Sequence, residues 1–235
     1  MLFFTVFELV AALPYSYSED LARTVAQLGA LAHCSPEVIS AWSCPLCKKL
    51  PLTNPQPFGL PDFNLSGYTG TMGTRLFLLF RGTEPESVIN WIEDLTFEMV
   101  AYPHCEGCRV HAGFFASFKA LRGQYFDRVQ QAVSAGKEVV VGGRSMGAAL
   151  AVFAVLDLAR TFPEHVRVSY NMGCPRLGNQ QFADWASKQL QIYRLVHWND
   201  IVPHLPPRTL NYRHISREVF YDEPMANFSL CNDSG

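Results

Sequence analysis

Residues 138–154 read EVVVGGRSMGAALAVFA, and this stretch decides the fold. An apolar run ends at Gly142, a short glycine-flanked segment follows, and small and apolar residues continue to Ala154. The pattern predicts a strand, a sharp turn and a helix, with Ser145 on the turn. A serine in a Gly-x-Ser-x-Gly turn of this kind is typical of a nucleophile elbow, which lifts the hydroxyl above the carboxyl edge of a parallel sheet. The alternative is a glycine-rich turn with an incidental serine.

The surrounding pattern predicts an α/β fold with a mostly parallel central sheet flanked by helices, because strands and helices alternate after residue 138. We expect the proline-rich residues 51–61 to form a surface connection. A chain of 235 residues fits one large domain. The expected strands are 66–72, 75–80, 138–142, 166–172 and 192–198, and the expected helices are 18–31, 87–95, 114–135, 146–160 and 179–190.

Composition excludes several classes of function. The net charge is −2 and no basic run occurs, so nothing favours nucleic-acid binding. Gly142-Gly143 is not a phosphate loop, and we expect neither a cofactor nor a metal ion.

Residues 1–17 are mostly apolar and are interpreted as a signal peptide or an N-terminal helix, with a wrongly assigned start as the third reading. They are too short to span a membrane.

Cysteine usage favours an oxidising compartment. Cys44 with Cys47 and Cys105 with Cys108 each form a Cys-x-x-Cys pair, and the pairs are too far apart for a zinc ribbon. We therefore predict two short disulfides in a secreted glycoprotein. The cysteine count is odd, and Cys174 is expected to be a buried free thiol. Glycosylation sequons begin at Asn64, Asn227 and Asn232.

The candidate acid is Asp200. It lies just past the expected strand 192–198, at the edge where active-site groups gather in α/β sheets. A nucleophilic serine needs such an acid to orient its base, and the order Ser145 then Asp200 agrees with serine hydrolases of this type. The alternative is that Asp200 caps the turn into the proline-rich loop that follows.

An oxyanion needs hydrogen-bond donors, and two loops offer them. The backbone N–H of Met146 comes directly after the nucleophile. The loop Phe80-Arg81-Gly82-Thr83 follows a buried strand, so the N–H of Thr83 is the second candidate donor. The alternative is an ordinary turn at the end of a strand.

Residues 84–95 follow this loop and suggest a lid. The expected short helix places its apolar residues on one side, where they could meet lipid, and its charges on the other. An ordinary surface helix is the alternative. The apolar residues are Val88, Ile89, Trp91, Ile92 and Leu95.

These motifs and their order resemble the fungal-type triacylglycerol lipases, or class 3 lipases, of the α/β-hydrolase fold. The resemblance implies that Ser145 is the nucleophile, Asp200 the triad acid, Thr83 and Met146 the oxyanion hole, and 84–95 the lid. It also implies a monomeric lipase acting on lipid esters at a lipid–water interface. Feruloyl esterases share the pattern. The matching stretches are residues 80–83, 90–95, 110–114, 143–147, 173–179, 199–207 and 212–220.

The chain departs from the family at the triad base. In the family this histidine lies well after the acid, in an Asp-His-Leu-type motif that does not occur before Gly235. His214 is the candidate substitute, although its position corresponds to a different family histidine, and His111, His197 and His204 likewise correspond to other positions or precede the turn. Without a base, the serine hydroxyl is a poor nucleophile, and we expect low turnover.

Two cysteines and Arg144 also depart from the pattern. Cys34 and Cys231 correspond to family half-cystines whose partners lie further along, so we expect 18–235 to be a lipase-like domain incomplete at its C-terminus. A Cys34–Cys231 bridge is the alternative. Arg144 replaces a family histidine and needs a carboxylate or water to satisfy its charge. The functional hypotheses are a secreted serine lipase or esterase, the same enzyme working through His214, and a non-catalytic lipase-like binding protein.

Overall fold

The computed structural model of the protein describes residues 16–82 and 96–231. An eight-stranded sheet forms the centre of this part of the chain. Neighbouring strands from β3 to β9 run parallel, and the strands at both margins pair antiparallel. The sheet that the sequence predicted is therefore confirmed. Its strands, in spatial order, are β1 (Thr53–Leu60), β2 (Leu65–Met72), β3 (Arg75–Phe80), β6 (Glu138–Arg144), β7 (Val166–Met172), β8 (Gln191–His197), β9 (Glu218–Tyr221) and β10 (Phe228–Cys231).

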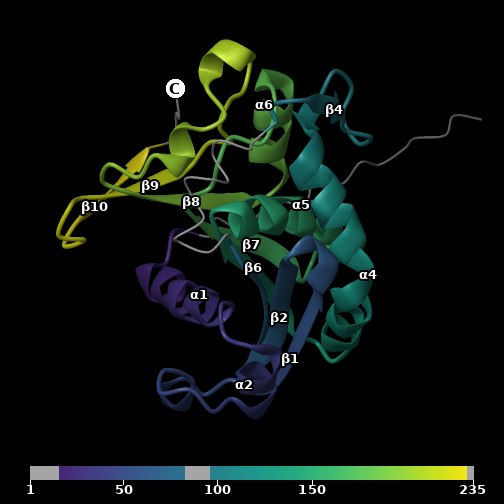
Figure 1. The fold of residues 1–235 in the computed structure, drawn as a ribbon, viewed down its shortest axis with the longest axis vertical. Helices are drawn as coiled ribbons and strands as arrows, with labels where there is room; N and C mark the ends of the chain where they lie inside the picture. Colours follow the sequence, from purple (N-terminus) through teal and green to yellow (C-terminus); the bar gives the residue numbers. More distant parts are fainter. Residues whose placement is uncertain (1–15, 83–95, 232–235) are drawn as a thin grey trace, which may run out of the picture.

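Helices cover both faces of this sheet, and Figure 1 shows α1 and α4 on opposite sides of it. A small second sheet pairs β4 (Met99–Ala101) with β5 (Arg109–His111). The α-helices are α1 (Glu19–Leu31), α2 (Pro36–Ala41), α4 (Ala112–Ser134), α5 (Met146–Thr161) and α6 (Gln180–Gln189). Short 3₁₀ helices are η1 (Cys47–Lys49), η2 (Pro61–Phe63), η4 (Val202–His204) and η5 (Arg208–Leu210).

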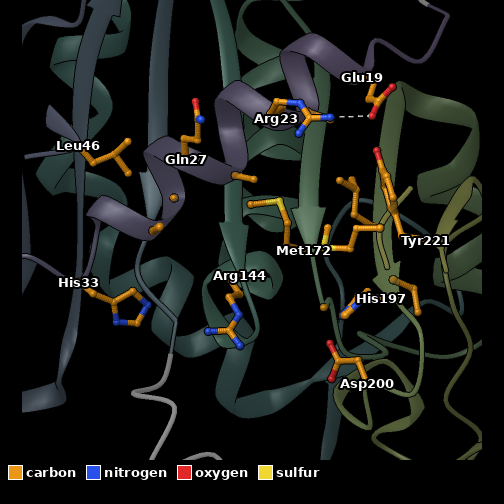
Figure 2. Close-up of a pocket in the computed structure, with 18 of the residues that line it drawn as sticks. Glu19, Arg23, Gln27, His33, Leu46, Arg144, Met172, His197, Asp200 and Tyr221 are labelled. Atoms are coloured by element: carbon orange, nitrogen blue, oxygen red, sulfur yellow. Dashed lines mark hydrogen bonds and ion pairs between the residues drawn. The ribbon is translucent and has the colours of Figure 1, made fainter. Parts of the chain in front are cut away.

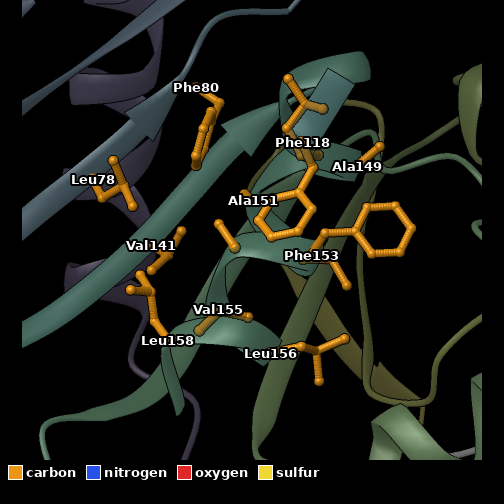
Figure 3. Packing of buried hydrophobic residues seen from close by; sticks show 14 of the residues in the cluster. Leu78, Phe80, Phe118, Val141, Ala149, Ala151, Phe153, Val155, Leu156 and Leu158 are labelled. Carbon is orange, nitrogen blue, oxygen red and sulfur yellow. The ribbon is translucent and has the colours of Figure 1, made fainter. Parts of the chain in front are cut away.

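The alternation of side chains along β3 divides the core into two clusters. Leu76, Leu78 and Phe80 face the side of α4 and α5, whereas Phe77 and Leu79 face α1. Such a strand reads as a continuous apolar run because both of its faces are buried. On the α5 side, Figure 3 shows Phe118, Val141 and Phe153 among the side chains that pack together.

α5 lies directly against the sheet because its residues are small. Nearly every residue from Gly147 to Leu158 is buried, and its alanines allow close approach to β6 and β7. A helix that is apolar on all sides belongs in a core. This burial fixes the start of α5, and with it the residue that precedes it, relative to the sheet.

The expectation for residues 51–61 is wrong. They form the edge strand β1 rather than an irregular connection, and β1 pairs with β2 through a register that shifts between Thr53 and Gln56. Proline lacks an N–H donor and is tolerated in a sheet only at an edge or a bulge. Pro55 and Pro57 lie on such an edge, so a proline-rich segment still forms a strand.

The cysteines fall into bonded and free groups. Cys44 is bonded to Cys47, and Cys105 to Cys108. Cys34, Cys174 and Cys231 are free, and Cys174 is buried. In the described part of the chain, no helix is long and apolar enough to cross a bilayer.

Candidate active site

Ser145 lies at the junction of β6 and α5 in a strained conformation. Its φ of 55° and ψ of −125° belong to a region that residues with a side chain rarely adopt. Its N–H donates to the carbonyl of Met172 at 2.9 Å, which ties the turn to the end of β7. A Cβ on Gly143 would lie 2.3 Å from the oxygen of Gly147, so the turn requires glycine there. The strand–turn–helix geometry is that of a nucleophile elbow.

The loop after β3 touches this elbow from the other side. A Cβ on Gly82 would lie 2.4 Å from the oxygen of Arg144 and 3.5 Å from Cβ of Ser145. Arg81 holds the loop by donating from Nη2 to the carbonyl of Asn64 at 3.0 Å. Met146 is the first residue of α5, where the N–H groups of a helix have no intrahelical acceptor. The second expected donor, Thr83, and the expected lid lie outside the described residues.

Asp200 follows β8 and closes a tight turn. Its N–H donates to the carbonyl of His197 at 3.0 Å, and its Oδ1 accepts from the N–H of Val202 at 3.0 Å. The side chain therefore caps the turn, and its second oxygen is turned toward Gly173. The capping role and the role of an acid are compatible, because a carboxylate accepts several hydrogen bonds.

Gly173 lies between the segment that binds Ser145 and the Asp200 carboxylate. It has a φ of 54°, and a Cβ built on it would lie 2.7 Å from Oδ2 of Asp200. Its preceding residue, Met172, accepts the hydrogen bond from Ser145, and its own N–H donates to the carbonyl of Leu195 at 2.9 Å. The segment Met172-Gly173 thus lies between the elbow and the acid turn. Only glycine combines this backbone with room for the carboxylate.

A cavity of about 980 Å³ opens beside Asp200, between α1 and the carboxyl ends of β6, β7 and β8. Figure 2 shows Arg144 in this cavity, between His33 and Asp200 in that view. Ala22, Ala26 and Met172 form part of its apolar wall. Arg144 is exposed, so water can hydrate its guanidinium, which was expected to need a carboxylate or water. Ser145 is not among the lining residues of this part of the structure.

Ser145 itself is 5 % exposed, and its Oγ has no hydrogen-bond partner among residues 16–82 and 96–231. An unpaired buried hydroxyl is costly in a structural serine and expected in a nucleophile that awaits its base. The geometry therefore favours a reactive serine over an incidental one. It does not supply the base.

His214 has another partner. Its Nε2 lies 2.6 Å from the carbonyl of Pro203, which can only accept, so Nε2 carries the ring's proton. Burial lowers the pKa of His214 well below its usual range, and the charges of Arg194 and Arg176 act in the same direction. The ring is neutral and donates to the loop that follows Asp200.

His111 and His197 are likewise engaged elsewhere. Nδ1 of His111 accepts from the N–H of Phe114 and caps α4, and burial lowers its pKa to about 4. Nε2 of His197 lies 3.1 Å from the carbonyl of Glu223. Among the described residues, no group of three or more histidine, cysteine or acidic side chains is arranged to hold a metal ion.

Two residues of this site, Gly173 and Arg176, lie in the matching stretch 173–179, but no role was predicted for either. Gly173 is a glycine directly after an expected strand, a signal of close backbone approach that could have been used. Arg176 lies three residues further on, and its guanidinium donates into the acid loop. A charged residue between two apolar segments carries no signal of what it contacts, because its partners are carbonyls distant in sequence.

A strained serine on the turn from β6 to α5, a glycine loop against it and a carboxylate past β8 of the same sheet define the α/β-hydrolase class. The family profile described as "Lipase (class 3)" matches residues 77–210. The chain belongs to this family.

Relatives and solved structures agree with this assignment. A lipase from Rhizopus niveus is 32 % identical over 223 residues, covering 88 % of this chain and 55 % of the relative. A secreted mono- and diacylglycerol lipase A from Penicillium cyclopium is 34 % identical over 174 residues, covering 69 % of this chain and 56 % of the relative. The chain thus spans about half the length of the curated relatives it matches.

Two solved structures share the fold. Lipase II from Rhizopus niveus has a TM-score of 0.83 and 28 % identity, with 93 % of this chain and 87 % of that chain covered. A structure described as "A serine protease triad forms the catalytic centre of a triacylglycerol lipase" has a TM-score of 0.77 and 28 % identity, with the same coverage of 93 % and 87 %. The α/β-hydrolase fold expected from the sequence is confirmed.

Proposed function

We propose that this protein hydrolyses carboxylic esters of lipids through an acyl-enzyme formed on Ser145. The observation that carries the proposal is the placement of the strained Ser145 and the Asp200 carboxylate on either side of Met172-Gly173. The loop at Gly82 lies against the same serine, so a carbonyl bound there meets both a nucleophile and backbone donors.

The chemistry proceeds in two halves. Oγ of Ser145 attacks the ester carbonyl while a base takes its proton, and the N–H groups of Met146 and Thr83 stabilise the oxyanion. Collapse of the tetrahedral intermediate breaks the bond to the alcohol, which leaves with the proton from the base. Water then attacks the acyl-enzyme by the same steps in reverse and releases the fatty acid.

The base that this chemistry requires is a histidine ring that reaches between Asp200 and Ser145. The cavity leaves space beside the Asp200 carboxylate, which would orient such a ring and stabilise its positive charge. The description of a serine protease triad in a related lipase structure supports this arrangement. His214 remains a candidate only if its bond to Pro203 breaks.

The proposal can be tested on the 235-residue chain with p-nitrophenyl butyrate. We expect slow hydrolysis that added imidazole raises several-fold, because free imidazole can accept the proton of the Ser145 hydroxyl. Ser145→Ala corrects for hydrolysis by imidazole in solution and should remove the protein-dependent rate. Asp200→Asn should remove most of the increase.

Three outcomes separate the alternatives. Fast hydrolysis without imidazole that His214→Ala abolishes identifies His214 as the base. Absence of any Ser145-dependent rate, with or without imidazole, contradicts the proposed function and favours a lipase-like binding protein. Preference for a feruloyl ester over p-nitrophenyl butyrate and tributyrin favours a feruloyl esterase instead.

Lipid esters are the proposed substrates because exposed apolar side chains surround the site. Phe63, next to the loop that Arg81 holds, is 70 % exposed, and Trp198 and Ile201, beside Asp200, are 47 % and 55 % exposed. Large apolar groups on one edge favour contact with a lipid surface. We propose that the 84–95 lid, with Val88, Ile89, Trp91, Ile92 and Leu95, adds to this surface when open.

We also propose that the protein is secreted and acts as a monomer. The two Cys-x-x-Cys disulfides fit an oxidising compartment, and the Penicillium cyclopium relative is named as secreted. Ser145, Gly82 and Asp200 come together within one copy of the chain, which fits a monomer. Light scattering of the purified protein would test the monomer.

A further inference from the structure

The loop after Asp200 is fixed through the backbone carbonyls of residues 203–206, each of which accepts a hydrogen bond. Pro203 accepts from Nε2 of His214 at 2.6 Å, and Leu205 accepts from the N–H of Arg176 at 2.7 Å. Nη1 of Arg176 donates to the carbonyls of His204 and Pro206, the latter at 3.0 Å. Two residues from other parts of the chain therefore bind every carbonyl from 203 to 206.

This loop and the acid form one connected unit. The N–H of Val202 donates to Oδ1 of Asp200, and the carbonyl of Val202 accepts from the N–H of Leu205 at 3.0 Å. A displacement of residues 203–206 is thus transmitted to the Asp200 carboxylate within a single turn of η4. Asp200 can keep its place only if the carbonyls of this loop keep theirs.

The other end of the connection is Gly173. Arg176 lies three residues after Gly173, where a Cβ would lie 2.7 Å from Oδ2 of Asp200, so its bonds tie the acid loop to the segment that also binds Ser145. Arg176 is 8 % exposed, and its guanidinium donates to carbonyls of the described residues rather than to a carboxylate. Burying a guanidinium is costly unless it is hydrogen-bonded, and this one binds two carbonyls of a single loop.

We propose that Arg176 and His214 are positioning residues that hold Asp200 against Gly173 for the hydrolytic reaction. The inference rests on the proposed function, in which Asp200 orients the base. It assigns His214 the role of a hydrogen-bond donor to the loop rather than that of the proton acceptor. Neither residue touches the reacting atoms.

We call the hydrogen bonds from Arg176 and His214 to the carbonyls of residues 203–206 the clamp. Two measurements test it, and the same chain offers matched controls. The variants Arg176→Ala and His214→Ala remove its donors. Arg128 also donates from Nη1 to two carbonyls, those of Gln56 and Pro57, and Nδ1 of His165 lies 2.9 Å from the carbonyl of Lys137. Arg128→Ala and His165→Ala therefore remove comparable bonds far from Asp200.

The first measurement is amide hydrogen exchange of residues 200–206, followed by mass spectrometry. We expect exchange there to accelerate roughly tenfold or more in Arg176→Ala and His214→Ala, and to remain unchanged in the controls, because only the first pair releases this loop. Arg176→Lys keeps the charge but loses the planar fork, so it should give an intermediate acceleration. Unchanged exchange in all three clamp variants overturns the proposal.

The second measurement is imidazole-supported hydrolysis by the same variants. We expect kcat to fall roughly 10- to 100-fold in Arg176→Ala with KM unchanged, because the acid is misplaced while the substrate surface is intact. His214→Gln places an amide donor near the position of Nε2 and should restore most of the kcat lost in His214→Ala. An amide can replace a hydrogen-bond donor but not a base. Equal loss of kcat in His214→Gln and His214→Ala would therefore overturn the positioning role.

The two measurements also separate the clamp from the function on which it rests. If the unmodified chain shows no Ser145-dependent hydrolysis, the proposed function fails, and the exchange result alone decides whether the clamp exists. If hydrolysis is present and Arg176→Ala behaves like Arg128→Ala in both measurements, the function stands and the clamp is overturned.

Discussion

At the scale of single residues, backbone conformation is the main determinant of the site. Ser145 and Gly173 both have positive φ values. Ser145 donates its N–H to the carbonyl of Met172, the residue directly before Gly173. The packing of the buried helix α5 keeps Ser145 in its strained conformation. Gly173 adopts a positive φ without strain because it has no side chain. The segment Met172-Gly173, which fixes the backbone of Ser145, therefore also leaves room for the Asp200 carboxylate.

Gly173→Ala tests this contact, with Gly73→Ala as its control. Gly73 has a φ of 59° and Gly173 one of 54°, but a Cβ at Gly73 meets nothing within 4 Å, while at Gly173 it lies 2.7 Å from Oδ2 of Asp200. Both variants should lose about 1 kcal/mol of folding stability, because alanine disfavours this backbone. Only Gly173→Ala should also lose most of the Ser145-dependent hydrolysis. Equal activity in the two variants would show that the contact with Asp200 does not matter.

At the scale of elements, the beginning of α4 depends on one histidine. Nδ1 of His111 accepts from the N–H of Phe114, and the ring stacks on that phenylalanine with 3.9 Å between centroids. His111 is 2 % exposed, and burial lowers its pKa from the ordinary 6.5 to about 4. Protonation would remove the acceptor and leave a charge in the core.

This pKa predicts a loss of stability in acid. The unfolded chain binds a proton at His111 near pH 6.5 and the folded chain only near pH 4, so the stabilisation is complete above pH 6.5 and is lost as the pH falls toward 4. The shift corresponds to roughly 3 kcal/mol. His111→Asn keeps a capping oxygen without titrating. Urea unfolding at about pH 7 and pH 4.5 should show a weaker pH dependence in this variant, and an unchanged one would refute the assignment.

At the scale of the whole molecule, a row of polar side chains crosses the sheet. Asn171, Arg194, Glu218 and Cys231 occupy matching positions on β7, β8, β9 and β10. Arg194 is 1 % exposed and pairs with Glu218 at 3.0 Å, and its Nε donates to the carbonyl of Ile215. The pair connects the strands that follow the acid loop to the centre of the sheet.

Glu218→Ala should destabilise the protein by about 3 kcal/mol, because it leaves a buried cation without its partner. The control is Glu138→Ala, which breaks the Arg75–Glu138 bridge between β3 and β6, whose side chains are 42 % and 44 % exposed. Exposed pairs contribute at most about 1 kcal/mol. Urea unfolding would measure both, and a similar loss in the two variants would contradict the role of burial.

The sequence alone was sufficient where the signal is local. The apolar run before Ser145 and the small residues after it predicted the strand, turn and helix, and the structure has β6 and α5 there. The sequence also predicted that Asp200 comes just after a strand, and the structure has it after β8. Residues 51–61 were misread because their prolines indicate a loop, and only the sheet shows that they lie on an edge where proline is tolerated.

By itself, the sequence determined the turn that carries Ser145, the place of Asp200 just after a strand and the alternation of strands and helices that makes the sheet parallel, since each depends on residues close together in the chain. The tertiary structure decided which distant groups meet. It placed Gly173 against Asp200, gave Arg176 the carbonyls of the acid loop and directed the ring of His214 to Pro203. These contacts follow from how β7, β8 and the loops after them pack together, and no local periodicity records them.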